Sequence, residues 1–276
     1  GPFRLQDSEP TNTGNHLISL GSHWFDRLRR WLAEPVAHVI GHNDWRAMNF
    51  GFLNNPAYDI WGAFWATVQL SVYSAIGALT WGTCLAAMRV GPVPAMRAFG
   101  TAYINIFRNT PLTVIIISCS LVLSNTLGVH LAAEDSATFI RDNNFRLAVL
   151  GFIAYTSTFV CEAVRSGINT VPPGQAEAAR AIGLPFRHVL LLIVLPQAMR
   201  AVIAPLASVL IALTKNTTVA ASIGVAEAAL LMNTMVENEP DQLIAVFLVF
   251  AAGFMLLTLP VGLLLGWLAR RVAVPR

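Results

Sequence analysis

Residues 60–88 read IWGAFWATVQLSVYSAIGALTWGTCLAAM and carry no charged side chain. An α-helix needs about 20 apolar residues to cross roughly 30 Å of hydrocarbon, so this run is long enough to span a bilayer. Asp59 and Arg89 close the run at its two ends. The stretch therefore predicts a transmembrane helix, and similar stretches further along the chain predict an all-α, polytopic membrane protein.

The other apolar stretches predict four further spans, at about residues 98–127, 145–164, 196–214 and 241–270. Arginines concentrate after the first, third and fifth spans, whereas acidic residues concentrate in the remaining loops. Positive charge favours the cytoplasmic side of a membrane. We therefore expect about five transmembrane helices, with the C-terminus and the loop 166–196 in the cytoplasm and the N-terminus outside.

The composition agrees with a chain whose main solvent is lipid. Hydrophobic residues make up 55% of the 276 residues and charged residues 12%, with a mean hydropathy of +0.59. Soluble domains carry about 25% charged residues, so a disordered chain and an ordinary cytosolic enzyme are excluded. The net charge of +3 is too small to indicate nucleic-acid binding. Cys84, Cys119 and Cys161 lie in apolar runs and predict buried thiols.

The N-terminal residues form a separate part of the chain. Residues 1–56 contain no span, and residues 22–40 place tryptophan and aliphatic side chains on one helical stripe. This pattern favours an amphipathic helix lying on the membrane lipid, although a helix packed on the bundle is the alternative. The domain prediction is an extension over 1–56 and a membrane domain over 57–272.

The loop between the third and fourth spans is unusual for a membrane protein. Residues 162–196 read EAVRSGINTVPPGQAEAARAIGLPFRHVLLLIVLP. Residues 171–174 break the chain, 175–182 form a short alanine-rich helix, and Gly183 is a natural helix stop. Small side chains let another surface approach the helix backbone closely. The pattern therefore favours a cytoplasmic helix that docks into a groove of a partner.

This loop resembles the EAA loop of the membrane subunits of ATP-binding-cassette importers. Glu177-Ala178-Ala179 is followed after three residues by Gly183, and after a further nine residues by Ile193, then by Leu195-Pro196. Residues 107–112, FRNTPL, resemble the FRGTPL element of the polar amino-acid branch, with Asn109 in place of glycine. The resemblance covers about residues 57–270. It is strongest to glutamate-importer permeases of high-G+C Gram-positive bacteria.

The resemblance implies a type I permease fold in a bacterial cell membrane, as a multi-pass protein. Two permease subunits, identical or related, would pair, and an extracellular solute-binding protein would deliver the amino acid. Separate ATPase subunits holding ATP-Mg would grip the coupling loop, at Gln175, Glu177, Ala178, Ala179, Gly183 and Leu184. The chain has no G-x-x-x-x-G-K-[ST] motif, so we expect no cofactor and no enzymatic site of its own.

Polar residues at membrane depth are costly and often functional. Arg108 lies 11 residues after Arg97, roughly 16 Å along a helix. The candidate substrate-binding residues are Arg108, Asn109 and Thr110 on the second span, and Lys215, Asn216, Thr217 and Thr218 after the fourth. The alternatives are that Arg108 braces a subunit interface and that Lys215 forms a structural link. Glu162 and Arg165, three residues apart, predict an ion pair.

The predicted function is translocation in an ATP-driven amino-acid importer, with glutamate as substrate. Glutamine, aspartate and basic amino acids remain open as alternatives. A different class, the ion-coupled secondary transporter, needs acidic residues near the midplane and internal repeats. Glu162 is peripheral and the five spans show no two matching halves, so this class is disfavoured.

Overall fold

The structure, a computed structural model, describes residues 50–272. The predicted interfacial helix of the N-terminal extension lies outside the described residues. The described chain forms these helices: η2 (Gly51–Asn54), α2 (Ile60–Val90), α3 (Pro94–Asn109), α4 (Leu112–Ser118), η3 (Cys119–Thr126), α5 (Phe139–Asn169), α6 (Pro173–Ala181), α7 (Phe186–His188), η4 (Val189–Val194), α8 (Leu195–Asn216), η5 (Thr217–Ile223), α9 (Ala228–Asn238), η6 (Pro240–Gln242) and α10 (Leu243–Val272).

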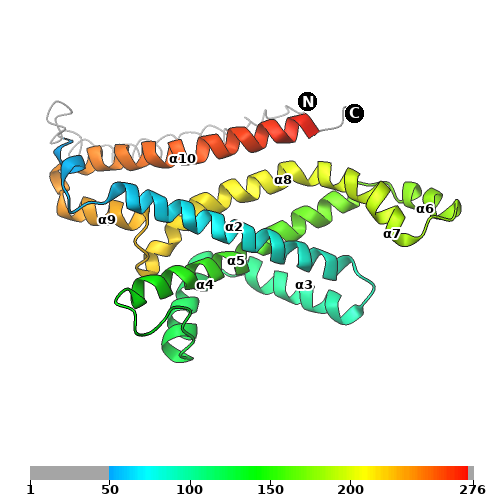
Figure 1. Cartoon of the computed structure of the whole chain (residues 1–276), viewed down its shortest axis with the longest axis horizontal. Helices are drawn as coiled ribbons and strands as arrows, with labels where there is room; N and C mark the ends of the chain where they lie inside the picture. Colours follow the sequence, from blue (N-terminus) through cyan, green and yellow to red (C-terminus); the bar gives the residue numbers. More distant parts are fainter. Residues whose placement is uncertain (1–49, 273–276) are drawn as a thin grey trace, which may run out of the picture. The chain divides into compact units, whose positions relative to one another are not determined.

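The prediction of an all-α membrane protein with about five spans is confirmed. Four stretches of the described chain, 60–90, 139–169, 191–223 and 240–267, are long and apolar enough to cross a bilayer. A fifth span is reached if α3 is counted together with the helix that runs from 112 to 126. The start of α2 and the end of α10 lie at opposite ends of the bundle (Figure 1).

The second span is sharply bent. The axes of α3 and the following helix differ in direction by 104°. Pro111 has no N–H to continue the helix, and Thr110 before it is extended, with φ −95° and ψ 131°. The Asn109 side chain donates to the Asn105 carbonyl at 2.8 Å, and the Thr110 hydroxyl donates to the Ile106 carbonyl at 2.7 Å. These two side chains therefore cap the last turn of α3 at the Asn105 and Ile106 carbonyls.

Close packing of α2 against α5 forms the centre of the bundle. A Cβ on Gly82 would lie 2.6 Å from Val160 Cβ and 2.7 Å from the Ser157 carbonyl oxygen, so only glycine allows this approach. At the end of α2, Arg89 pairs with Glu162 of α5. The predicted pair of Glu162 with Arg165 is therefore wrong, because helix packing places Arg89 nearer.

The three cysteines differ in burial. Cys119 and Cys161 are buried, as expected, whereas Cys84 lies on an exposed face of α2.

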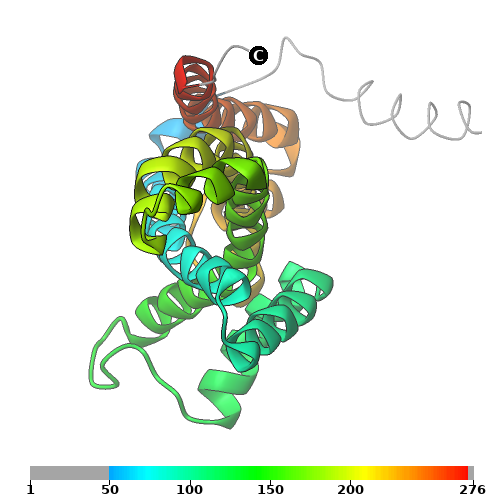
Figure 2. The same ribbon diagram turned by 90° about the vertical axis from the view of Figure 1, so that its right-hand side faces the viewer.

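The two ends of the bundle carry different short elements. In Figure 1, α6 and α7 lie beside the end of α5 and the start of α8, and Figure 2 views the bundle from that end. The opposite end carries α9 and the start of α2 (Figure 1). The 11 residues of α9 are too few to cross a bilayer. The fold therefore separates the coupling loop from α9 by the length of the spans.

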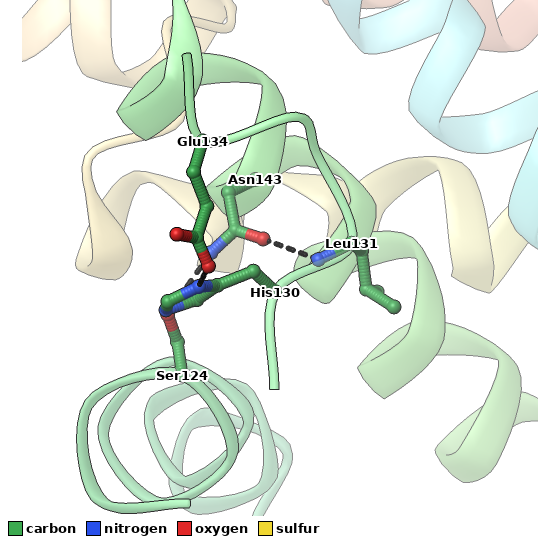
Figure 3. A network of polar contacts seen from close by, with 5 residues as sticks. All are labelled: Ser124, His130, Leu131, Glu134 and Asn143. Atoms are coloured by element: carbon green, nitrogen blue, oxygen red, sulfur yellow. Dashed lines mark hydrogen bonds and ion pairs between the residues drawn. The ribbon is translucent and has the colours of Figure 1, made fainter. Parts of the chain in front are cut away.

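A polar network holds the loop that joins η3 to α5 (Figure 3). The buried Asn143 accepts from the Leu131 backbone N–H at 2.8 Å and donates to Ser124 Oγ at 3.0 Å. His130 and Glu134 pair within the loop. The loop is thus anchored to the first turns of α5.

Candidate functional site

The predicted coupling loop contains a short helix, α6, and both ends of this helix are fixed. Pro173 occupies the first turn of α6, where its missing N–H costs no hydrogen bond. At the other end the Leu184 N–H donates to the Ala179 carbonyl at 3.1 Å, and the Gly183 N–H donates to the Arg180 carbonyl at 2.9 Å. Gly183 has a φ of +87°, in the left-handed region. These bonds are those of a Schellman motif, which ends the helix in one defined direction.

One face of α6 is free in the described chain. Gln175, Glu177, Ala178 and Gly183 are exposed, and Leu184 is half-buried. Ile182, directly after α6, is 80% exposed. Ala179 is also a predicted coupling residue, but it is only 4% exposed and faces the chain's own core. The Gln197 side chain donates to Gln175 Oε1 at 2.6 Å, which ties α6 to α8.

The predicted substrate-binding residues divide into helix caps and free cations. Thr217 donates to the Thr214 carbonyl at 2.8 Å and Thr218 to the Lys215 carbonyl at 3.0 Å, as Asn109 and Thr110 do on α3. The side chains of Arg108 and Lys215 are exposed and form no hydrogen bond or ion pair with the part of the chain that the structure describes. Asn216, the last residue of α8, is half-buried. Two cations therefore remain available for a ligand or a partner.

The structure brings these two segments to one hydrophobic cluster. Leu112, which follows the α3–α4 break, packs on a cluster that contains Leu213 of α8 and Ala220 of η5. The cluster also includes Leu70 of α2 and Phe152 of α5. Both interrupted helices thus meet where the long helices pack, although they are about 100 residues apart in sequence.

A buried carboxylate that sequence reasoning missed joins α9 to α2. Glu227 is 0% exposed, and it accepts from the N–H groups of Ala229 at 2.9 Å and Leu230 at 3.0 Å. Thr67 Oγ1 of α2 lies 3.4 Å from Glu227 Oε2 and accepts from the Ala228 N–H at 3.2 Å. Burial raises the pKa of the Glu227 carboxyl, and these hydrogen bonds oppose the rise. The sequence signal is a polar side chain directly before an apolar helical run, which is an N-cap.

Removing this cap is expected to destabilise the protein. Glu227→Ala leaves the N–H groups of the buried Ala229 and the half-buried Leu230 unpaired, at a cost of about 2–3 kcal/mol in the free energy of unfolding. Thermal unfolding of the protein in detergent measures the effect as a lowered Tm. Glu227→Gln, whose amide oxygen still accepts from α9, is the matched control and is expected to lose less. Equal losses for the two variants would contradict the capping role.

The chain is similar to known membrane transport subunits. The family model described as binding-protein-dependent transport system inner membrane component matches residues 78–274. The glutamate transport system permease protein GluC of Corynebacterium efficiens is 60% identical over 214 residues, which cover 78% of this chain and 94% of the relative. The probable glutamine ABC transporter permease protein GlnM of Bacillus subtilis is 31% identical over 76% of this chain and 91% of the relative.

A solved structure has the same fold. The crystal structure of an amino acid ABC transporter with histidines superposes with a TM-score of 0.67 at 23% identity, over 77% of this chain and 93% of that chain. The fold likeness therefore extends over nearly the whole length of a solved transporter chain.

Proposed function

Because this chain belongs to the family of binding-protein-dependent transport system inner membrane components, we propose that it forms the translocation pathway of an ATP-driven glutamate importer. Its place is the membrane component and not the ATPase subunit, and membership implies an ATPase and a solute-binding protein as partners. The observation that carries the choice of glutamate is the 60% identity to GluC over 94% of that permease.

The proposed energy input enters through α6. Ala178 on α6 and Ile182 just after it are exposed and offer an apolar surface on a helix whose ends are fixed. A rigid helix transmits displacement better than a mobile loop, because little of the motion is lost in bending. We propose that an ATPase groove receives this surface and that ATP-driven closure moves the attached spans through Gln175 and Gln197.

The proposed orientation places α6 and the C-terminus in the cytoplasm and the N-terminus outside. The arginine distribution supports it, since Arg97 at the start of α3, Arg180 of α6 and Arg187 of α7 lie at the α6 end. A second permease subunit, identical or related, would complete the pathway. Arg108 and Lys215 are proposed to contact the substrate, with Asn109, Thr110, Asn216, Thr217 and Thr218 shaping the helix ends that present them.

Uptake by the reconstituted transporter tests the proposal. In proteoliposomes holding this chain with its ATPase and binding protein, ATP is expected to drive accumulation of labelled glutamate. A proton or sodium gradient without ATP is expected to drive none, because the energy enters through the ATPase. Competition with unlabelled glutamine, aspartate and arginine ranks the alternative substrates. Accumulation driven by an ion gradient alone would show that the protein is a secondary transporter.

A further inference from the structure

A cavity of about 560 Å³ lies between α2, the first turns of α5 and the turn that leads to α9. Its polar lining consists of Gln69 and Tyr73 from α2 and of Arg141, Asp142 and Arg146 from α5. Gln69 lies nine residues into α2, about 14 Å from its start. The cavity thus occupies the half of the spans opposite α6, and its volume is in the range of small-molecule sites.

The charged side chains of this cavity differ in whether they already have a hydrogen-bond partner. Arg146 donates to the Leu131 carbonyl, and Asp142 Oδ2 accepts from Thr138 Oγ1 at 2.7 Å. The side chain of Arg141 forms no hydrogen bond or ion pair with any residue between 50 and 272 that the structure describes. The same side chain also lines a neighbouring cavity of about 340 Å³, beside Asp59 and Gly62. A guanidinium between two cavities, with all its donors free, is placed to receive an anion.

The lining matches one chemical class of ligand. Arg141 and Arg146 contribute a charge of +2 to the cavity and Asp142 contributes −1, so its formal charge is +1. An acidic amino acid carries two carboxylates and one ammonium group, and therefore a net charge of −1 at neutral pH. Guanidinium donors match a carboxylate in pairs, and a carboxylate accepts from an ammonium group. Neutral and basic amino acids leave the excess positive charge uncompensated.

We propose that this cavity is a receiving site for an acidic amino acid, in which Arg141 binds a carboxylate and Asp142 the ammonium group. The inference rests on the proposed function and places a specificity-determining contact before the substrate reaches Arg108. In this proposal Arg146 supports the loop through its hydrogen bond to Leu131, and it makes a second, weaker contact with the ligand.

The test compares Arg141→Gln, Arg141→Lys and Arg97→Gln in the proteoliposomes described above. Arg141→Gln is expected to lower ATP-driven glutamate uptake at least about tenfold, the factor for one lost charge-assisted hydrogen bond. Binding-protein-stimulated ATP hydrolysis is expected to stay within about twofold of wild type, because the site contacts substrate and not the motor. Arg141→Lys retains the charge and is expected to recover part of the uptake.

Arg97→Gln removes the same group from an exposed position on α3, and uptake is expected to be unchanged. Unchanged uptake by Arg141→Gln would overturn the site while leaving the proposed function standing. A parallel fall in uptake and ATP hydrolysis would also overturn it, since the substitution would then act on assembly. Absence of glutamate uptake by the wild-type protein would overturn the proposed function itself.

Discussion

Replacing Gly183 by arginine is expected to separate this chain from its ATPase and to abolish ATP-driven uptake, while the spans still insert. Gly183 has a φ of +87°, where a side chain costs about 1–2 kcal/mol and redirects the chain leaving α6. The long cation would also project beside the exposed Ile182, on the surface proposed to enter the ATPase. Co-purification of the ATPase with a tagged permease measures association, and membrane fractionation measures insertion.

A pair of alanine substitutions separates the backbone effect from bulk. A Cβ at Gly183 or at Gly174 would meet no atom within 4 Å, so space is available at both positions. Of these two glycines, Gly183 alone has a positive φ. Gly183→Ala is therefore expected to weaken ATPase association, and Gly174→Ala to leave it unchanged. Normal co-purification of the Gly183→Arg variant would show that the ATPase does not depend on this turn.

Helix α6 is the element that the sequence predicts most closely, because its ends depend on local chemistry. Proline at the first helical turn and glycine after the last residue are recognisable without tertiary information. The sequence predicts a helix over 175–182, and the structure has Pro173–Ala181. The earlier start follows from Pro173, which begins a helix as readily as it interrupts one. The burial of Ala179, in contrast, depends on how α6 packs and could not be read from composition.

Features that depend on distant contacts could not be predicted. Pro111 predicts a break in the second span, but the angle of 104° depends on the packing of α4 against α5 and η5. Glu227 and Thr67 are 160 residues apart, so the sequence shows an acidic residue in an apolar stretch without its partner. The cavity at Arg141 likewise forms only when α2 and α5 pack together. The sequence identifies where helices are interrupted, whereas tertiary packing determines the bend angle, the side-chain contacts and the cavity at these places.

Replacing Arg108 by alanine is the other change expected to have a large effect. The side chain lies in the last turn of α3 beside the break, 11 residues from Arg97 along a continuous helix, and has no partner in the described chain. If it grips a substrate carboxylate with two charge-assisted hydrogen bonds, about 3 kcal/mol is lost, and uptake falls roughly a hundredfold. Labelled-glutamate uptake measures the loss, with basal ATP hydrolysis measured in the same vesicles.

The same measurement separates substrate contact from bracing of a subunit interface. A contact residue can be removed without loosening the complex, so Arg108→Ala is expected to purify with its ATPase and second permease subunit at wild-type yield. Arg108→Lys keeps a cation but loses the paired donors, and its uptake is expected to lie between those of wild type and Arg108→Ala. Dissociation of the complex on Arg108→Ala would assign the side chain to the interface. Glutamate would then have to be recognised elsewhere, and the side chains of Arg141 and Lys215 are the other cationic groups proposed to do so.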